Sequence, residues 1–143
     1  MNHLWLIFGL LSAVTAALVG VLGKVGLQSV DANTATSVRA IIMAVFLLFI
    51  TAAQGNLNQI PVIIADKKAL LFIGLSGIAG ALSWLFYFWA LKFGKVSQVA
   101  PIDKLSVVIA TVLAVTFLGE KVNLLTTLGV SLIAIGSLIV ALS

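Results

Sequence analysis

The chain has 143 residues, of which 62% are hydrophobic and only 8% are charged, and its formal net charge is +4. A soluble domain carries about 25% charged and about 45–50% apolar residues, so this composition excludes a soluble enzyme, a disordered tail and a nucleic-acid-binding domain. The sequence has no cysteine and one histidine, which excludes disulfides, thiolate metal sites and a cysteine nucleophile. We therefore expect a membrane protein with no metal and no cofactor.

Five apolar runs are long enough to cross a bilayer, since a span needs about 20 mainly apolar residues. The runs lack polar–apolar alternation, which favours helices over barrel strands. The chain is therefore predicted to be one all-α transmembrane domain over residues 1–143, a bundle of five helices in the lipid bilayer. The expected helices are residues 4–23, 35–53, 69–91, 97–118 and 124–142.

The connectors are short, and only residues 54–68 leave room for further structure. This connector contains the apolar run 60–64, which is too short to span a bilayer. The run either lies at the membrane interface or starts the third helix early. In the last connector, Gly119 is expected to cap the end of the fourth helix and Asn123 the start of the fifth.

Positive charge hardly distinguishes the two sides of the membrane. Five spans place the termini on opposite sides, with Lys67, Lys68 and Lys121 on the N-terminal side. The other side holds Lys24, Arg39, Lys92, Lys95 and Lys104. Arg39 and Lys104 fall within spans, so the loop charges are balanced and the positive-inside rule indicates no orientation. Either a partner sets the orientation or the protein inserts both ways.

Arg39, Asp103 and Lys104 are predicted to share one depth in one half of the bilayer. At 1.5 Å per residue each lies about 5–7 Å from the middle of its helix. A charge at that depth costs about 2.5–3.5 kcal/mol, so each needs a partner or water. Asp103 and Lys104 point about 100° apart and suit different partners. We expect Asp103 to pair with Arg39 across helices, which leaves Lys104 for a cavity, a backbone carbonyl or an anionic ligand.

A purely structural interpretation of these charges stays open. The Asp103–Arg39 pair then locks two helices, and Lys104 extends to the near interface. Pro101 also allows two interpretations. It frees a carbonyl and breaks the turn beside Asp103 if the helix already extends from Ser97. Alternatively, it is the first residue of a regular helix.

Aromatic residues crowd the end of the third predicted helix, at positions 84, 86, 87, 88 and 89. An aromatic belt at the headgroup level explains most of them. Trp84 lies deep for a belt, and it shares a helix face with Tyr87. Trp84 and Tyr87 could therefore line a pocket for an apolar or cationic substrate.

Small residues recur on one face of several predicted helices, where they allow backbones to approach closely in lipid. They are Gly9, Ala13, Ala17 and Gly20 in the first helix, Gly74, Gly77, Gly80 and Ala81 in the third, and Gly129 and Gly136 in the fifth. We interpret these faces as helix-packing surfaces, with a sliding surface for helices that rock as the alternative.

The sequence contains no phosphate-binding Gly-x-x-x-x-Gly-Lys-Ser/Thr motif, no Ser/His/Asp set and no pair of carboxylates within a span. An intramembrane enzyme needs at least two cooperating groups at one depth. Arg39, Asp103 and Lys104 could bind an anion, but they include no nucleophile. We therefore expect that the protein is not an enzyme.

Several short motifs, in this order, resemble the EamA-like members of the drug/metabolite transporter superfamily, particularly the short five-helix type. They are Lys24 at the end of the first helix, Arg39 near the start of the second, Tyr87-Phe-Trp-Ala-Leu91, Val99-Ala-Pro-Ile-Asp-Lys-Leu-Ser106, and Phe117-Leu-Gly-Glu120 followed by Gly129 and Gly136. Longer members usually carry other residues at the positions of Asp103 and Lys104.

The resemblance implies that this chain is one half of a ten-helix inverted-repeat architecture. It further implies an antiparallel homodimer, or pairing with a similar short chain. The function expected is a secondary transporter for a small organic solute in the cell membrane, with a substrate site formed by Arg39, Trp84, Tyr87, Asp103 and Lys104. The alternatives are a flippase for an anionic lipid head group and a non-transporting subunit that only packs against a partner.

Overall fold

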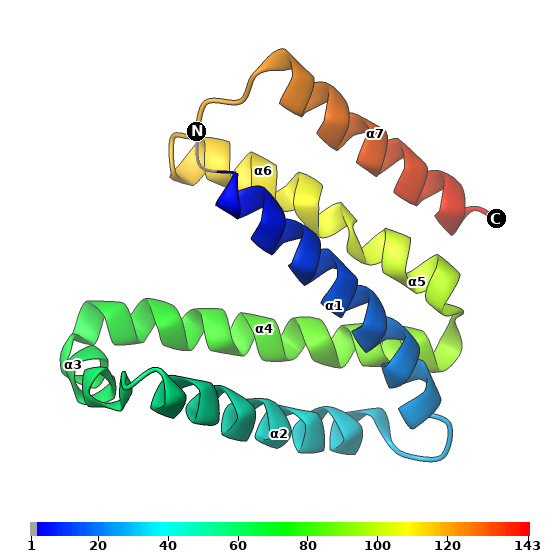
Figure 1. Cartoon of the computed structure of the whole chain (residues 1–143). Coiled ribbons are helices and arrows are strands. Elements are labelled where there is room, and N and C mark those ends of the chain that lie inside the picture. Colours follow the sequence, from blue (N-terminus) through cyan, green and yellow to red (C-terminus); the bar gives the residue numbers. More distant parts are fainter. Residues whose placement is uncertain (1–2) are drawn as a thin grey trace. The chain divides into compact units, whose positions relative to one another are not determined.

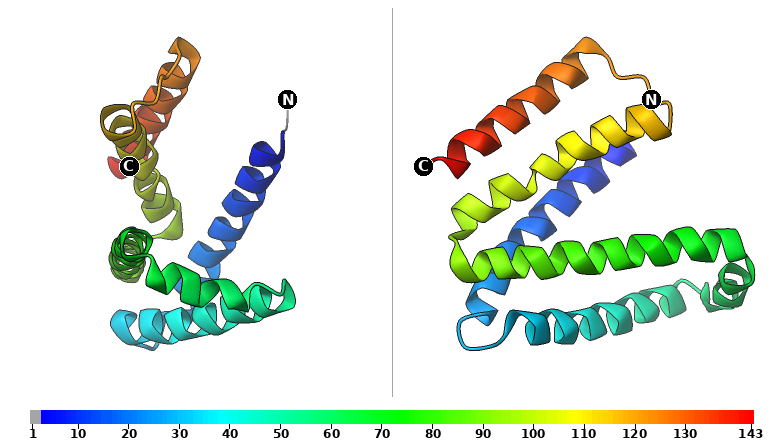
Figure 2. Two further views of the ribbon diagram at one scale, coloured as in Figure 1. Left: turned by 90° about the vertical axis from the view of Figure 1, so that its left-hand side faces the viewer. Right: turned by 180° about the vertical axis from the view of Figure 1, so that it is seen from behind.

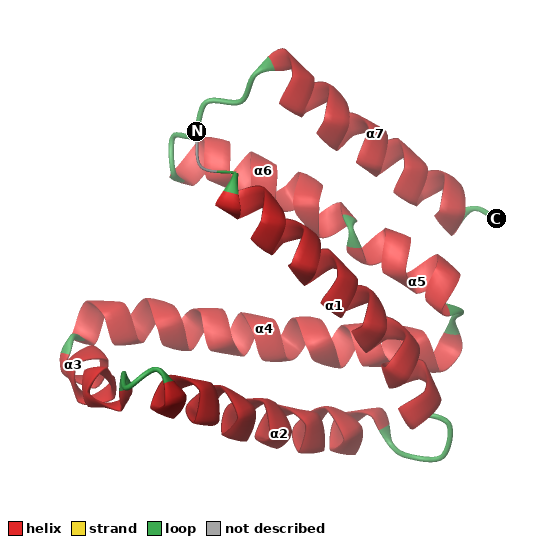
Figure 3. Ribbon diagram, viewed as in Figure 1, coloured by secondary structure: helices red, strands yellow, loops and turns green. Residues whose placement is uncertain are grey.

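The computed structural model describes residues 3–143, and every regular element in that range is a helix (Figures 1 and 3). This confirms the predicted all-α fold. The elements are α1 (Leu4–Gly26), α2 (Ala32–Ala53), the short 3₁₀ helix η1 (Leu57–Gln59), α3 (Ile60–Ala65), α4 (Lys67–Phe93), α5 (Val96–Asp103), α6 (Leu105–Phe117) and α7 (Leu124–Ala141).

Five helical segments are long and apolar enough to cross a membrane, as the sequence predicts. They are α1, α2, α4, the consecutive pair α5–α6 and α7. The third span is longer than expected at both ends, because Lys67 and Lys92 continue the helix beyond its apolar part. Long lysine side chains can reach the headgroups from such positions.

Polar caps define where the second span begins and ends. The Asp31 carboxylate accepts a hydrogen bond from the Thr34 backbone N–H at 2.9 Å, so α2 starts three residues earlier than the apolar pattern indicates. At the other end, Gly55 adopts φ +72° and the Asn56 N–H donates to the Thr51 carbonyl at 3.0 Å. This arrangement is a glycine C-cap that satisfies the last carbonyls of the helix.

The caps predicted for the last connector are also present. Gly119 has φ +68°, in the left-handed region that favours glycine. The Asn123 side chain accepts a hydrogen bond from the Thr126 N–H at 2.8 Å. The fourth span therefore ends at Phe117, shortly before Gly119, and the fifth starts directly after Asn123.

The apolar run 60–64 forms a separate helix, α3, and does not extend α4. The backbone breaks at Asp66, with φ −82° and ψ 96°. The Asp66 carboxylate then accepts hydrogen bonds from the N–H groups of Lys68 and Ala69, both at 3.0 Å. Asp66 thus caps the start of α4, and this cap separates the two helices.

The chain divides into two compact units, which are described separately. The first comprises residues up to Lys24 and from Phe93 onward. In it, α7 packs alongside α5 and α6 and runs in the opposite direction (Figure 2). Lys24 of α1 donates a hydrogen bond to the Gly94 carbonyl at 2.9 Å, which ties the end of α1 to the turn before α5.

The second unit comprises residues Val25–Lys92 and is built around α2 and α4. These helices run in opposite directions and diverge toward α3, which bridges their far ends (Figure 2). Near their other ends, the Trp89 indole N–H donates to the Asn33 side-chain oxygen at 2.7 Å. Lys92 also donates to the Val30 carbonyl at 3.3 Å. These two bonds hold the start of α2 against the end of α4.

Candidate functional site

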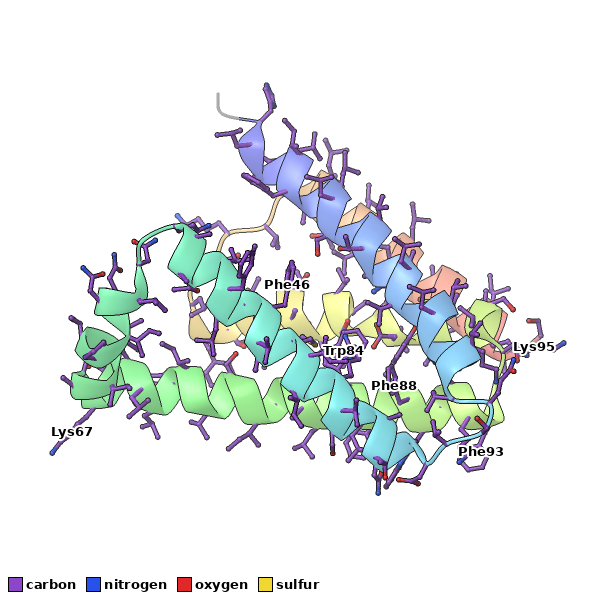
Figure 4. All side chains as sticks on the ribbon, turned by 60° about the horizontal axis from the view of Figure 1, so that its bottom comes forward. Phe46, Lys67, Trp84, Phe88, Phe93 and Lys95 are labelled. Atoms are coloured by element: carbon purple, nitrogen blue, oxygen red, sulfur yellow. The ribbon has the colours of Figure 1, made fainter. Side chains whose placement is uncertain are left out.

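An arginine on α2 lies against an aromatic ring on α4. The guanidinium carbon of Arg39 is 3.5 Å from the centroid of the Trp84 ring and 5.3 Å from that of Phe88. Figure 4 shows Trp84 and Phe88 on the side of α4 that is turned toward α2. We call Arg39, Trp84, Tyr87 and Phe88 the Arg39 cluster.

The rings of the Arg39 cluster support one another. Trp84 meets Tyr87 edge to face at a centroid distance of 5.7 Å and Phe88 at 6.0 Å. Helical spacings of three and four residues place these rings on one face of α4. Edge-to-face pairs contribute about 0.5–1.5 kcal/mol beyond their buried area. The ring under the guanidinium is therefore held in place by its neighbours.

Both carboxylates of the α2–α4 unit are used as helix caps. Asp31 caps α2 and Asp66 caps α4. The hydrogen bond from the Thr34 backbone lowers the pKa of Asp31 below its ordinary value of 3.8. Among the described residues of this unit, therefore, Arg39 has aromatic partners and no carboxylate.

Stacking occupies the flat face of a guanidinium, whereas its five N–H donors lie in the plane. In a bilayer, donors of this kind need a hydrogen-bonding partner, because an unsatisfied group costs several kcal/mol. The rings of the Arg39 cluster can therefore hold the guanidinium in a fixed place, while the N–H edge of the guanidinium stays available to water, a carboxylate or a ligand.

The fourth span is interrupted beside its charged residues. Pro101 lies inside α5, and a short turn at Lys104 separates α5 from α6 (Figure 3). The Lys104 N–H donates to the Pro101 carbonyl at 3.1 Å, and the Val107 N–H donates to the Lys104 carbonyl at 3.0 Å. Both bonds join residues that are three positions apart, whereas the bonds of an α-helix join residues four positions apart. Such tight turns within a helix often mark hinges. The first interpretation of Pro101, a helix that already runs before it and breaks near Asp103, is therefore confirmed.

Asp103 and Lys104 contact each other at this break. The Lys104 ammonium is 3.3 Å from an Asp103 carboxylate oxygen, and the two side chains are 54% and 36% exposed. The expectation that they would turn to different partners is therefore wrong, because the long lysine side chain bridges the angle between neighbouring positions. An exposed pair of this kind is weak, so both groups can exchange partners at low cost.

A family comparison adds to this geometry. The model of the EamA-like transporter family matches residues 3–142, almost the whole chain. The chain belongs to the EamA-like transporter family. It is thus a multi-pass protein of the cell membrane and, by family, a membrane transporter, as the sequence predicts.

Two relatives are similar to this EamA-like chain. A Sinorhizobium protein named "Uncharacterized transporter in cobO 3'region" is 42% identical over 144 residues, covering 99% of each chain. An uncharacterized protein of Methanocaldococcus jannaschii is 32% identical over 82 residues, or 57% of this chain and 60% of the relative. No solved structure gives a significant match.

The predicted site residues of this EamA-like chain fall into two groups. Arg39, Trp84 and Tyr87 come together in the α2–α4 unit, whereas Asp103 and Lys104 meet at the α5–α6 break in the other unit. The pairing of Arg39 with Asp103 stays a prediction.

Sequence analysis missed two contributors to the α2–α4 unit of the transporter. Phe88 supplies a second ring near Arg39, and the spacing of four residues from Trp84 was the signal that could have shown it. The bond between Trp89 and Asn33 joins residues that are 56 positions apart. No local pattern indicates such a contact, because it depends on how two helices are paired.

Proposed function

We propose that this EamA-like chain is a secondary transporter that moves a small organic metabolite across the cell membrane by alternating access as a dimer. The observation that carries the proposal is the placement of Arg39. It lies on a membrane span about 10 Å from the start of α2 at 1.5 Å per residue, and it stacks on Trp84 with no carboxylate partner in its own unit. Intramembrane charges of this kind mark substrate and ion pathways.

In this proposal, the polar part of the substrate site comprises Arg39, Asp103 and Lys104. Trp84 and Tyr87 form its apolar wall. Asp103 lies about 10 Å from the start of α5 by the same helical rise, a depth that matches that of Arg39 in α2. The weak contact between Asp103 and Lys104 supports a role in solute handling, since a charged ligand can displace either partner.

The interrupted fourth span supports alternating access. Transporters commonly place discontinuous helices at the substrate site, because the freed backbone groups face the ligand and the two halves can tilt separately. Here the break lies directly at Asp103 and Lys104. A change in the α5–α6 angle would therefore move both charges together.

A dimer would supply the second half that rocking requires. The five spans would form one half of a ten-helix assembly, completed by an antiparallel second copy or by a similar short chain. The balanced lysines support antiparallel pairing. The glycine faces of α4 and α7 also support it, because a methyl group added at Gly77, Gly80, Gly129 or Gly136 would meet no atom within 4 Å. Such faces are open to a partner helix.

Reconstitution tests the proposed function. Liposomes containing the wild type are expected to take up at least one member of a metabolite panel faster than empty liposomes. Lys104→Ala should reduce this uptake about tenfold, since losing a charge that contacts the substrate costs roughly 1.4 kcal/mol.

The matched control is Lys121→Ala, which removes the same side chain from the connector before α7. It should leave uptake unchanged. Equal uptake by the wild type and Lys104→Ala, above that of empty liposomes, would refute the site assignment. Uptake no faster than in empty liposomes for every solute would refute transport.

A further inference from the structure

Resting on the proposed function, we infer that the solute is an organic monocarboxylate. Its carboxylate binds the N–H edge of Arg39, and its apolar part packs against the rings of Trp84, Tyr87 and Phe88.

The charges inside the spans provide the first argument. Arg39 is the one charged residue within α2, and the two carboxylates of the α2–α4 unit serve as helix caps, so the spans of this unit carry one net positive charge away from their ends. The lysines of this unit lie at helix ends, where Lys92, for example, donates to the Val30 carbonyl. A net charge in the low-dielectric part of a bilayer is costly. One bound anion of unit charge removes that cost.

The geometry of Arg39 provides the second argument. Its flat face is taken by Trp84 at 3.5 Å, and the rings around Trp84 hold that face in place. The remaining edge presents pairs of parallel N–H donors, which match the two oxygens of a carboxylate. A lysine offers no such fork. An arginine fixed in this manner therefore recognises a planar oxyanion better than it recognises a neutral polar group.

The amount of charge distinguishes a carboxylate from other anions. A phosphate monoester carries about −1.5 to −2 at neutral pH, so it would replace one excess positive charge with a negative one. A zwitterion would leave the positive charge uncompensated. A monocarboxylate gives neutrality, and the aromatic rings beside Arg39 suit an apolar substituent on it.

Ligand-induced thermal stabilisation of the purified full-length chain in nanodiscs tests the inference. The probes are two series, each built on one hydrocarbon group: the benzyl compounds phenylacetate, phenylacetamide, phenethylamine and benzyl phosphate, and the pentyl compounds hexanoate and hexanamide. At least one carboxylate should stabilise the wild type and bind about 30-fold more tightly than its amide, since an unpaired buried charge costs that much affinity. Equal stabilisation by amide and carboxylate, or stronger stabilisation by the amine or the phosphate, would overturn the inference.

Two substitutions assign the effect to Arg39. Arg39→Gln should abolish carboxylate binding. Arg39→Lys, which keeps the charge and guards against a folding failure, should weaken it about tenfold because the fork is lost. Lys121→Gln is the control and should bind like the wild type. Carboxylate binding that survives both Arg39 substitutions would overturn the inference.

Uptake separates this inference from the proposed function. Wild-type liposomes are incubated with a mixed metabolite extract, and the retained solutes are identified by mass spectrometry. Enrichment of monocarboxylates supports both statements, whereas enrichment of neutral, cationic or phosphorylated solutes keeps the transport function and overturns the carboxylate. Carboxylate binding that needs Arg39, without any uptake, keeps the anion site and refutes transport.

Discussion

A tryptophan face is a suitable neighbour for an arginine in a bilayer, because it attracts the cation without cancelling its charge. A carboxylate in the same place would neutralise Arg39 and occupy its donors. Trp84 instead fixes the guanidinium through the electrostatic attraction of its ring, which contributes up to about 2 kcal/mol when water is excluded. Arg39 is thus held in position and remains able to bind an anion.

The first prediction concerns this contact. Trp84→Ala should lower the free energy of unfolding by about 2–3 kcal/mol, since it removes the stacking and leaves a gap beside Phe88. Trp84→Phe keeps a ring at the same place and should cost about half as much. Circular dichroism during SDS titration in bicelles measures both changes.

Trp5→Ala is the control for this prediction. Trp5 is 73% exposed on α1, so its removal should change the free energy of unfolding by less than about 0.5 kcal/mol. A loss for Trp84→Ala no larger than that for Trp5→Ala would show that the ring does not hold the guanidinium.

At this scale, the sequence indicated some of the contacts and missed others. Arg39, Trp84 and Tyr87 were expected in one site, and their side chains do lie together in the α2–α4 unit. The contact between Asp103 and Lys104 was not predicted, because the angle between helix positions says nothing about how far a flexible lysine can bend. Partner choice depends on side-chain length and on the break after Asp103.

Among the elements, the α5–α6 span is interrupted by a proline and a tight turn. Pro101 has no N–H and therefore leaves the Ser97 carbonyl without its helical donor. The tight turn at Lys104 follows directly. In the proposed transport cycle, these two neighbouring breaks would let α5 tilt relative to α6.

The second prediction uses the two prolines of the chain. Pro101→Ala restores the missing donor and should raise the free energy of unfolding by about 1–3 kcal/mol, while uptake by reconstituted liposomes should fall because the span stiffens. Pro61→Ala is the matched control, since Pro61 lies in the first turn of α3, where no helical bond is lost. It should change neither quantity. Undiminished uptake by a stabilised Pro101→Ala variant would show that the break serves packing alone.

Element positions were largely predictable, because long apolar runs determine where spans lie. Their ends were less predictable, since Asp31 and Asp66 act as caps whose side chains lie outside the apolar pattern. The separation of α3 from α4 has the same cause. The arrangement of the helices is still harder to predict. Apolar helix faces gain little from packing against each other in lipid, so hydrophobicity alone does not determine which helices are neighbours.

For the whole molecule, the balance of loop lysines is the most informative property. A transporter half that pairs with an inverted copy needs both orientations in one membrane, and an even charge distribution provides no bias against either. A half that pairs with a different chain needs only one orientation.

The third prediction follows from this balance. C-terminal fusions to one reporter active only in the cytosol and to another active only outside should both give signal in whole cells. Adding lysines on one side, by Asn56→Lys with Asn58→Lys, should fix a single orientation and abolish uptake. Gln28→Lys with Ser29→Lys should fix the opposite one.

Co-expression of these two variants is the decisive control. It should restore uptake, because each supplies the orientation that the other lacks. Signal from only one reporter in the wild type would contradict self-pairing in opposite directions and favour a second, similar chain.

One compact unit is formed by two separate stretches of the chain, up to Lys24 and from Phe93 onward, and this has a consequence for biogenesis. Lys24 donates to the carbonyl of Gly94, which is 70 positions later in the chain. At about 5–20 residues per second, the ribosome needs roughly 4–14 s to add those residues. Residues Val25–Lys92 are synthesised during that interval, before the carbonyl that receives the Lys24 ammonium exists. The α2–α4 unit is therefore complete in the growing chain before the bond that ties α1 to the turn before α5 can form.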